Sequence, residues 1–390
     1  MDRNSSKTTV QQIMLEFAER TGLLSDSAPR RRYLWTDAFA VCNYLGIYLQ
    51  TGEERYKRLA LGLVDQVHNV LGRHRDDDPR TGWIGGMDEQ SGSLHPTMGG
   101  LRIGKKLNER KHYDPYDEPL EWDRDGQYFH YLTKWMHALH RVSRITGDPI
   151  YHRWAVELAK AVHARFVYVT PSGKKRIFWK MSIELTYPLE SSMGHHDPLD
   201  GFLTYLELQA TAAKASESSV NRGIRSEIED MSDMIKGRKW ATSDPLGIGE
   251  LLSSSYKLSQ LIICEGVEQT DLLSVLLDAS LISLRNYVKS NSSALSADHR
   301  GAFRELGLCI GLHAVEKLQK LMNQASNDSE TKHSLHERAE RLMNFVYLSK
   351  AIEGYWLDPG NRETDDWISH RDINMVMLAT CLAPDGYLSL

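Results

Sequence analysis

Thr51–His68 reads TGEERYKRLALGLVDQVH, and Thr146–His163 reads TGDPIYHRWAVELAKAVH. Both stretches begin with Thr-Gly, both have a tyrosine five positions later, and apolar side chains then recur at intervals of three and four. This spacing places the apolar side chains on one side of a helix, so each stretch is predicted to form a helix with one buried stripe and one solvated face. His68 and His163 occupy equivalent positions, which the packing of a repeated unit explains better than catalysis does.

Each of these amphipathic helices follows a stretch of different character. Thr36–Gln50 is apolar nearly all round, as are much of Gly126–Thr146, Leu246–Cys264 and Gly301–Leu318. A helix that is apolar on every side has to be surrounded by protein, so inner and outer helices are predicted to alternate. The six inner helices are expected to begin near Trp35, Asp125, Leu199, Leu246, Arg300 and Arg371. The six outer helices are expected over Thr9–Arg20, Glu53–Arg73, Asp148–Val167, Ser219–Lys236, Asp271–Lys289 and Leu335–Lys350.

The connections from outer to inner helices are long. They include His74–Arg124, Tyr168–Pro198 and Gly354–His370, all far longer than the typical connection of about 4–6 residues. Within the second of them, Val167–Thr170 and Arg176–Met181 flank Pro171-Ser172-Gly173 and predict a small hairpin. Long loops in a compact domain are usually functional, so the face that carries them is the expected binding face.

This alternation of buried and amphipathic helices resembles the (α/α)6 toroid of the six-hairpin glycosidase superfamily. The resemblance covers essentially the whole chain and implies an all-α fold with residues 1–390 in a single domain. It also implies a carbohydrate substrate, because similar toroids include glycoside hydrolases, polysaccharide lyases and sugar epimerases. No catalytic motif of one particular family is matched, so the resemblance leaves the reaction open.

Composition excludes several other classes of protein, such as nucleic-acid-binding and membrane-surface proteins. The formal net charge of −5 gives no basic field for nucleic acid or for a membrane surface. Met1–Val10 is polar and lacks the apolar core of a secretion signal, so a cytoplasmic location is expected. Cys42, Cys264, Cys309 and Cys381 lie in apolar runs, with no CxxC pair and no histidine at metal-ligand spacing. They are predicted to be buried free thiols, and no cofactor is expected.

Acidic residues gather at the predicted starts of the inner helices. Glycoside cleavage needs two carboxylates, one acting as acid and one ionised. Asp123 and Asp125 are the leading candidates, within the stretch Leu120–Tyr131, and Asp123 is preferred because Asp125 falls where a carboxylate would cap the helix. The possible catalytic partners are Asp37, Asp200, Asp372 and His196. For any single one of these acids, helix capping or an arginine ion pair is about as good an explanation.

Aromatic and basic residues accompany these acids. Five aromatic residues are predicted to stack on sugar rings: Trp35, Trp83, Trp122, Tyr128 and Trp367. Five further residues are predicted to bind substrate polar groups, the arginines fitting a uronic acid carboxylate: Arg102, Arg124, His195, His370 and Arg371. The adjacent pair His195-His196 lacks a third ligand at diagnostic spacing, so no metal is expected there.

These features favour a carbohydrate-active enzyme, with glycoside hydrolysis by a carboxylate pair preferred. The first alternative is a sugar epimerase or isomerase in which His195 or His196 transfers a proton. The second is a toroid that binds a sugar or a protein partner without catalysis. For the enzyme interpretations, the expected partner is a small-molecule carbohydrate substrate, without nucleic acid or membrane, and the sequence leaves the oligomeric state open.

Overall fold

The computed structural model describes residues 3–24, 31–214, 223–290, 295–324 and 330–390. The chain is mainly helical, as predicted, and divides into two compact units. Ala18–Lys236 form the N-terminal unit, whereas Met1–Phe17 and Gly237–Leu390 together form the C-terminal unit. Among the described residues, no helix combines the length and the apolar character that a membrane crossing requires.

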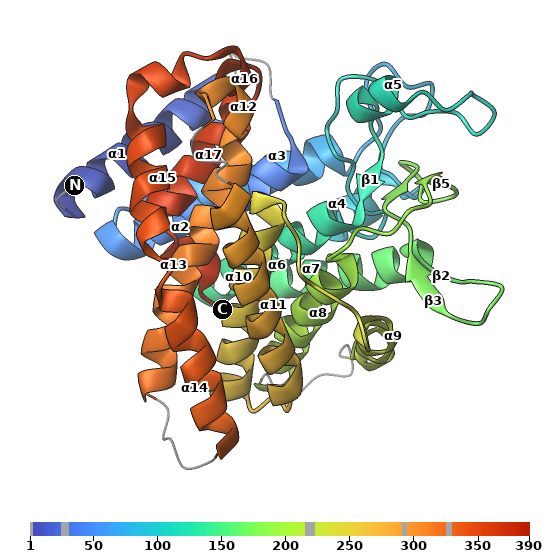
Figure 1. Cartoon of the computed structure of the whole chain (residues 1–390). Helices are drawn as coiled ribbons and strands as arrows, with labels where there is room; N and C mark the ends of the chain where they lie inside the picture. Colours follow the sequence, from blue (N-terminus) through green and yellow to red (C-terminus); the bar gives the residue numbers. More distant parts are fainter. Residues whose placement is uncertain (1–2, 25–30, 215–222, 291–294, 325–329) are drawn as a thin grey trace. The chain divides into compact units, whose positions relative to one another are not determined.

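The N-terminal unit contains three helix pairs (Figure 1). They are α2 (Leu34–Thr51) with α3 (Glu54–Leu71), α6 (Phe129–Thr146) with α7 (Pro149–Phe166), and α8 (Asp197–Lys214) with α9 (Arg225–Ile235). The shared geometry of the first two turns explains the repeated Thr-Gly: Gly52 and Gly147 have φ angles of 72° and 76°, the left-handed conformation that ends a helix. Helix α6 packs against both α2 and α8, so the first helices of the three pairs are neighbours.

The two repeated stretches pack as predicted. Every residue of α2 from Leu34 to Ile47 is buried, whereas α3 buries one stripe that includes Leu59, Leu63 and Val67. Helix α7 buries the equivalent stripe, and His68 and His163 are both buried within it. Because each buried leucine or valine contributes roughly 1.5–3 kcal/mol, these stripes account for much of the stability of the helix pairs.

Buried histidines give the N-terminal unit a defined response to acid. Burial lowers the pKa of both His68 and His140 to about 3, from a usual value of 6.5. Below pH 6.5 the unfolded chain therefore binds protons that the folded chain does not, and stability falls as the pH falls. We expect each histidine to add about 1.4 kcal/mol per pH unit to this loss between about pH 6 and pH 4. Urea unfolding of His68→Gln over this range should show a slope shallower by that amount, and an unchanged slope would contradict it.

A three-stranded sheet, not predicted from the sequence, connects the long loops. Its strands β1 (Gln127–Tyr128), β4 (Lys180–Met181) and β5 (Pro188–Glu190) are antiparallel in the order β1-β4-β5. Because Gln127 and Tyr128 belong to this sheet, α6 begins at Phe129 and not near Asp125 as expected. Gly126 makes the turn with a φ of 147°, and a Cβ there would lie 2.7 Å from the Met181 carbonyl oxygen.

The predicted hairpin is partly right. Strands β2 (Val167–Val169) and β3 (Lys175–Ile177) pair across the turn at Pro171-Ser172-Gly173. The second predicted strand ends at Ile177, however, because Lys180 and Met181 pair with β1 and β5. The two other loop elements are short helices, α4 (Glu89–Leu94) and α5 (Glu118–Asp123).

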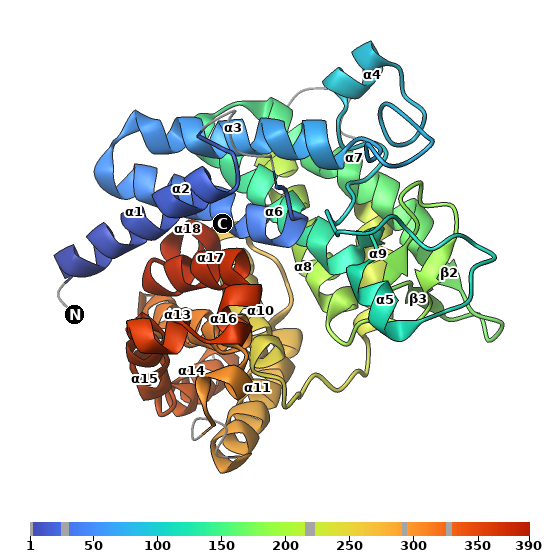
Figure 2. The same ribbon diagram turned by 90° about the horizontal axis from the view of Figure 1, so that it is seen from above.

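The C-terminal unit contains the other helices (Figure 2). They are α10 (Pro245–Glu265), α11 (Thr270–Ser290), α12 (Ala297–Arg300), α13 (Ala302–Gln324), α14 (Glu330–Met343), α15 (Tyr347–Leu357), the 3-10 helix η2 (Pro359–Arg362), α16 (Asp365–Ser369), α17 (Arg371–Leu382) and α18 (Asp385–Leu388). Helix α1 (Arg3–Arg20) also belongs to this unit as far as Phe17. Helices α10 and α13 touch through glycines, since a Cβ on Gly249 would lie 2.0 Å from the Gly307 carbonyl oxygen.

Three outer helices differ clearly from their predicted bounds. The helix expected over Thr9–Arg20 begins earlier, at Arg3. The helix expected over Leu335–Lys350 is divided into α14 and α15, because Phe345 and Val346 donate to carbonyls three residues back and so tighten the chain into a turn. The helix expected over Ser219–Lys236 begins at Arg225, and residues 219–222 lie outside the described part of the chain.

The prediction of four buried free thiols holds only for Cys42. Cys264 is exposed, near the end of α10. Cys309 and Cys381 form a disulfide, with Cα atoms 6.0 Å apart, because α13 packs against α17. His313 follows Cys309 by one helical turn, so the statement that no cysteine has a histidine at metal-ligand spacing is also wrong.

Candidate functional site

Seven rings form a continuous aromatic cluster in the N-terminal unit. We use this name for Tyr33, Trp35, Trp122, Tyr128, His130, Tyr131 and Trp179. Neighbouring ring centroids are 4.8–6.4 Å apart, from 4.8 Å for His130–Tyr131 to 6.4 Å for Trp35–Tyr131. Trp179 contacts three of these rings, at 5.2 Å from Tyr128, 5.9 Å from Trp122 and 6.3 Å from His130.

Local structure brings these rings together from three segments. Tyr33 precedes α2, and Tyr128 precedes α6, so both rings lie at helix starts. Trp179 joins them because the residue after it, Lys180, pairs with Tyr128 in the sheet. Trp179 was not predicted from the sequence, where the only signal was the alternation of Ile177, Trp179 and Met181 in a loop assigned to a hairpin.

Two lysines border the cluster. The Lys180 ammonium lies 5.5 Å from the Tyr128 ring and donates to the Glu121 carboxylate (2.8 Å) and to the Arg124 carbonyl (2.9 Å). The Lys105 ammonium lies 5.4 Å from the Tyr33 ring. Burial and the nearby Lys180 lower the pKa of Lys105. Lys105 is therefore a partly desolvated cation beside the rings, and it was not predicted.

The cluster includes a pair of hydroxyl groups. The hydroxyls of Tyr33 and Tyr131 lie 2.7 Å apart. Burial raises the pKa of both groups well above the usual value, so both stay protonated near neutral pH. One of the two can donate to the other and leave its partner's proton directed elsewhere.

Histidines and acids from the start of α8 meet the start of α6. His130 has its Nδ1 atom 3.7 Å from the Asp197 carboxylate, and the rings of His195 and His196 are 4.7 Å apart. His196 is buried, whereas His195 is exposed. The structure thus brings the starts of α2, α6 and α8 together within the N-terminal unit.

Three of the predicted acids are held in internal hydrogen bonds. Asp125 is fully buried and accepts from Arg102 Nη1 (2.9 Å), Arg75 Nη1 (3.4 Å) and the backbone N–H groups of Gly104 (2.9 Å) and Gly126 (3.0 Å).

Asp37 and Asp200 have the same kind of environment. Asp37 accepts from Arg32 Nη1 (3.4 Å) and the Tyr33 N–H (2.9 Å). Asp200 accepts from Lys134 Nζ (2.8 Å) and from the Thr133 hydroxyl. A carboxylate with such partners stabilises the positions of the elements that it joins. Asp123 differs, because it is exposed at the end of α5.

Several predicted binding residues anchor the His74–Arg124 loop. All three guanidinium nitrogens of Arg102 donate. Their acceptors are Asp125 and the Arg73 carbonyl (2.9 Å), which flank the loop at its two ends, and the Val70 carbonyl of α3 (2.8 Å). Trp83 is 3% exposed and lies beneath the Arg73 guanidinium at 4.2 Å. Arg124 lies 3.7 Å from the Asp114 carboxylate.

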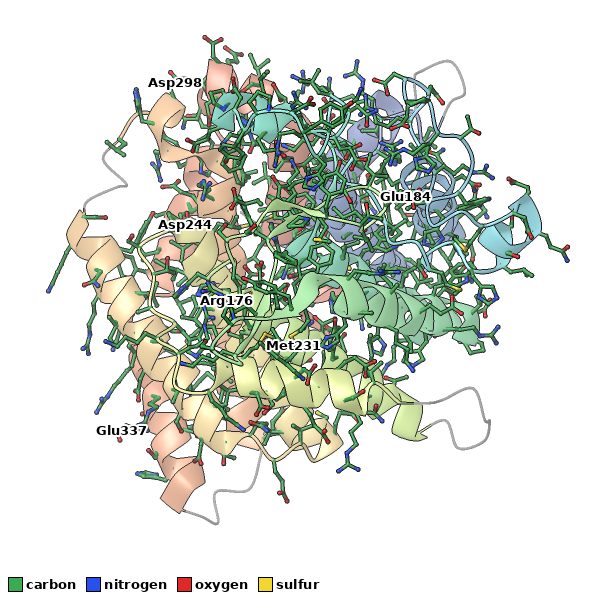
Figure 3. The ribbon with its side chains drawn as sticks, turned by 90° about the vertical axis from the view of Figure 1, so that its right-hand side faces the viewer. Arg176, Glu184, Met231, Asp244, Asp298 and Glu337 are labelled. Carbon is green, nitrogen blue, oxygen red and sulfur yellow. A yellow bond between two sulfur atoms is a disulfide. The ribbon has the colours of Figure 1, made fainter. Side chains whose placement is uncertain are left out.

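A residue from the next loop adds to this anchor. Glu184, labelled in Figure 3, accepts from the Gly85 N–H (3.0 Å) and pairs with His74 Nε2 (2.6 Å). The base of the long loop is therefore fixed from both sides. Its tip is open to solvent, with Tyr113 and Tyr116 exposed.

The remaining predicted residues belong to the C-terminal unit. The starts of α10, α13 and α17 meet there, since Arg304 pairs with Asp244 (2.7 Å) and the Phe303 ring lies 5.8 Å from that of His370. Asp372 is half-buried in the first turn of α17.

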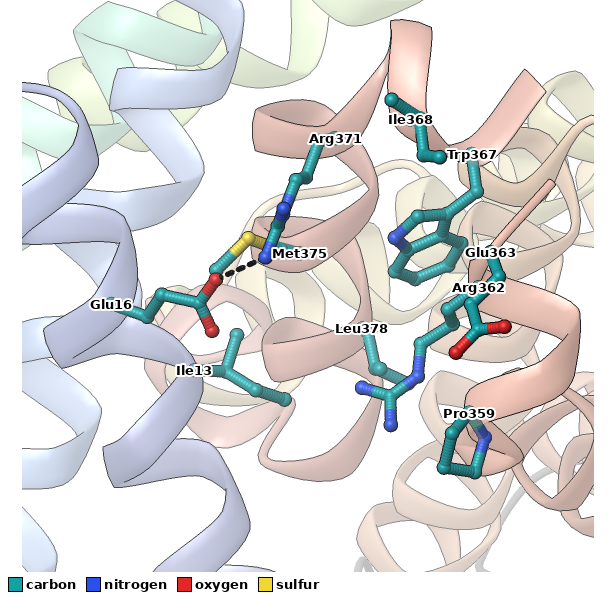
Figure 4. A pocket seen from close by; sticks show the side chains of 10 residues that line it. All are labelled: Ile13, Glu16, Pro359, Arg362, Glu363, Trp367, Ile368, Arg371, Met375 and Leu378. Atoms are coloured by element: carbon teal, nitrogen blue, oxygen red, sulfur yellow. Dashed lines mark hydrogen bonds and ion pairs between the residues drawn. The ribbon is translucent and has the colours of Figure 1, made fainter. Parts of the chain in front are cut away.

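A pocket of about 280 Å³ lies beside α17 in the same unit (Figure 4). Its lining includes Trp367 and Arg371, two of the predicted binding residues. Trp367 is 3% exposed and stacks on Trp356 at 5.5 Å, while Arg371 pairs with Glu16 at 2.6 Å. The same unit thus holds the predicted Trp367, His370, Arg371 and Asp372.

No protein-family model and no curated protein matches the chain. Solved structures do match. An alpha-1,6-mannanase from Salegentibacter sp. is 11% identical with a TM-score of 0.55, over 97% of this chain and 99% of that one. Cellobiose 2-epimerase from Bacillus thermoamylovorans is 10% identical with a TM-score of 0.52, over 97% and 98%. A sugar epimerase from a ruminal bacterium is 10% identical with a TM-score of 0.51, over 98% of each chain.

These likenesses extend over nearly the whole length of each chain. The protein has the same (α/α)6 toroid fold as these enzymes, which confirms the predicted fold class.

Proposed function

We propose that this protein is a carbohydrate-active enzyme, with residues 1–390 acting as one toroid domain and the aromatic cluster forming part of its substrate site. Two observations support the proposal. The solved structures with this fold include a mannanase and two sugar epimerases, and the cluster lies at the starts of α2 and α6, with Asp197 at the start of α8 facing His130. The C–H faces of a pyranose ring stack on exposed indole rings, and Trp122 is 53% exposed with its ring nearly perpendicular to that of Trp179.

For the reaction, we propose proton transfer at a sugar carbon, as in an epimerase or isomerase. The observation that carries this choice is the position of His130, which stacks near Trp179 while its Nδ1 faces the Asp197 carboxylate. A general base is typically oriented by a second group, and at 3.7 Å the Asp197 carboxylate lies just beyond direct hydrogen-bond distance of this imidazole. Sequence favours hydrolysis, but Asp37, Asp125 and Asp200 are already engaged with cationic side chains.

Epimerisation of an open-chain sugar requires three contributions. A base removes the proton from the carbon next to the carbonyl, a cation or hydroxyl stabilises the negative charge on the carbonyl oxygen, and an acid returns a proton to the opposite face. His130 is the proposed base, Lys105 and the Tyr33–Tyr131 hydroxyl pair are the proposed stabilisers, and His196 is the proposed acid. Uronic acids remain candidate substrates, because Lys105 would also bind a carboxylate.

Glycoside hydrolysis is the second candidate, supported by Asp123. It is the exposed member of the predicted acids in the N-terminal unit, and its carboxylate is close enough to Lys105 to influence the pKa of that ammonium. Asp123 would serve as one of the two carboxylates that hydrolysis needs.

A single experiment separates these reactions. The protein is incubated in heavy water with a panel of reducing mono- and disaccharides, and the products are followed by NMR and by a reducing-end assay. Epimerisation should introduce deuterium next to the carbonyl without new reducing ends, and His196→Ala should abolish it. Hydrolysis should create reducing ends without that deuterium, and Asp123→Asn should abolish it. Sugar binding with neither product would indicate a non-catalytic toroid and overturn the enzyme proposal.

A further inference from the structure

Four metal-binding side chains converge in the C-terminal unit, on helices that the proposed reaction does not use. They are Cys309 and His313 of α13, Glu353 of α15 and Cys381 of α17, and one donor atom from each lies within 4.8 Å of the others. Cys309 and His313 are four residues apart, so they project from the same side of α13. We refer to these four residues as the four-donor cluster.

We propose that the four-donor cluster binds a zinc ion when Cys309 and Cys381 are reduced. Zinc prefers four ligands in a tetrahedron, and thiolate, imidazole and carboxylate groups are its usual ligands in proteins. Metal–ligand bonds of about 2.0–2.3 Å place neighbouring donor atoms about 3.4–3.8 Å apart. The four donor atoms therefore need to move by about 1 Å or less to reach that arrangement.

One carboxylate oxygen, Glu353 Oε1, lies close to the other three donor atoms of the four-donor cluster. Glu353 Oε1 lies 2.6 Å from His313 Nε2 and 3.9 Å from the sulfur atoms of both Cys309 and Cys381. The 2.6 Å distance between the imidazole nitrogen and the carboxylate oxygen is that of a direct hydrogen bond. A zinc ion would take the place of this hydrogen bond and be reached by all four side chains.

The second nitrogen of the histidine is also oriented. His313 Nδ1 lies 3.4 Å from a carboxylate oxygen of Glu316, on the same helix. Histidine ligands of metals usually donate their remaining ring N–H to a carboxylate, which fixes the ring and leaves the other nitrogen free to coordinate. Glu316 therefore supplies the supporting contact that such a ligand needs.

The four donor side chains are buried to different extents, which would shield a bound metal ion and still let it enter from solvent. Cys309 and Cys381 are fully buried, whereas the side chains of His313 and Glu353 are 18% and 22% exposed. The ion would be shielded on the thiolate side and reached from solvent past the imidazole and the carboxylate. All four positions are occupied by protein ligands, which is typical of a structural zinc site and not of a catalytic one.

The disulfide and the metal site use the same sulfur atoms and exclude each other. A reductant of the thiol or phosphine class supplies two electrons, the S–S bond breaks, and two protons complete the thiols Cys309 and Cys381. Zinc then binds as the two thiol protons leave. The structure thus assigns two forms to one site, an oxidised form cross-linking α13 to α17 and a reduced form holding zinc between α13, α15 and α17.

The test uses full-length protein that has been reduced with a phosphine, stripped with a chelator and desalted without oxygen. Cobalt(II) is titrated first, because tetrahedral cobalt–thiolate sites absorb visible and near-ultraviolet light. Zinc is then added and counted by mass spectrometry after gel filtration. We expect about one equivalent of either metal per chain and a rise of several degrees in Tm with zinc.

Variants and the oxidised protein make the result decisive. Cys309→Ser and Cys381→Ser should lose the cobalt–thiolate absorption, and Cys264→Ser, which removes an exposed cysteine outside the cluster, should retain it. Should the serine variants fail to fold, Glu353→Gln and His313→Gln change partly exposed side chains and should weaken zinc binding at least tenfold. Equal binding by reduced and oxidised parent, or no binding by the reduced parent, would overturn the proposal.

Discussion

Replacing Asp125 by asparagine is expected to lower the free energy of unfolding by about 3–5 kcal/mol. The carboxylate is fully buried between the guanidinium groups of Arg102 and Arg75 and two backbone N–H groups. Asparagine keeps the shape but removes the negative charge, so Arg102 would be left as a buried cation without its counter-ion. The loop that begins at His74 and the start of α6 would lose their shared anchor.

Urea unfolding of the variant, followed by circular dichroism and tryptophan fluorescence, measures this effect. The matched control is Asp123→Asn, two residues away but exposed, which should change stability by less than about 0.5 kcal/mol. Adding Arg102→Met to Asp125→Asn should recover part of the loss, because both buried charges are then removed. If Asp125→Asn were as stable as the parent but inactive, Asp125 would be catalytic, as the sequence allowed.

Replacing His130 by glutamine is expected to reduce kcat for sugar epimerisation by about 10²–10⁴-fold, the usual contribution of a general base. The side chain is half-buried, so the fold should tolerate the change within about 1 kcal/mol. Steady-state kinetics on the substrate found in the heavy-water panel, together with thermal unfolding, provide the two readouts.

The control for His130 is His112→Gln. His112 is exposed in the same unit and stacks on Tyr187 at 5.3 Å, outside the aromatic cluster. It should leave kcat and KM unchanged. If His130→Gln turned over substrate as fast as the parent, His130 would not be the general base. Hydrolysis with Asp123 would then be the favoured reaction.

Periodicity predicted the helices well because helix burial is a local property. The stripe of α3 and the all-round burial of α2 follow from spacings of three and four within one segment. The short sheet could not be predicted this way. Its strands have two or three residues each, and β1 joins β4 across more than fifty positions of sequence, from Gln127 and Tyr128 to Lys180 and Met181.

Site residues were harder to predict because the partner of each acid is distant in sequence. The partners of Asp125 are Arg102, at a distance of 23 residues in the sequence, and Arg75, at a distance of 50 residues. Nothing in Glu121–Asp125 indicates these contacts. The capping explanation offered for Asp125 was too local for the same reason. Trp122 and Tyr128 were recognised by residue type, whereas Trp179 required knowledge of the strand pairing.

The four-donor cluster illustrates the same limit. The spacing of Cys309 and His313 is visible in the sequence, yet Cys381 lies 72 positions beyond Cys309 and Glu353 comes from a third helix. Only the packing of α13 against α15 and α17 brings the four donors together. A short sequence motif therefore cannot reveal this set of residues.

The division of the chain has a consequence for the order in which it folds during synthesis. Ala18–Lys236 is one uninterrupted segment, so all the residues of the N-terminal unit have left the ribosome before most of the C-terminal unit is made. The segment Met1–Phe17 is made before Ala18–Lys236 but reaches its contacts late, because the Arg371 that pairs with Glu16 comes 355 positions after it. Closing so long a loop in an unstructured chain is slow, and folding of the N-terminal unit within it reduces the length of chain that is still unstructured. The part of α1 up to Phe17 is thus among the last segments of residues 1–390 to reach its native contacts.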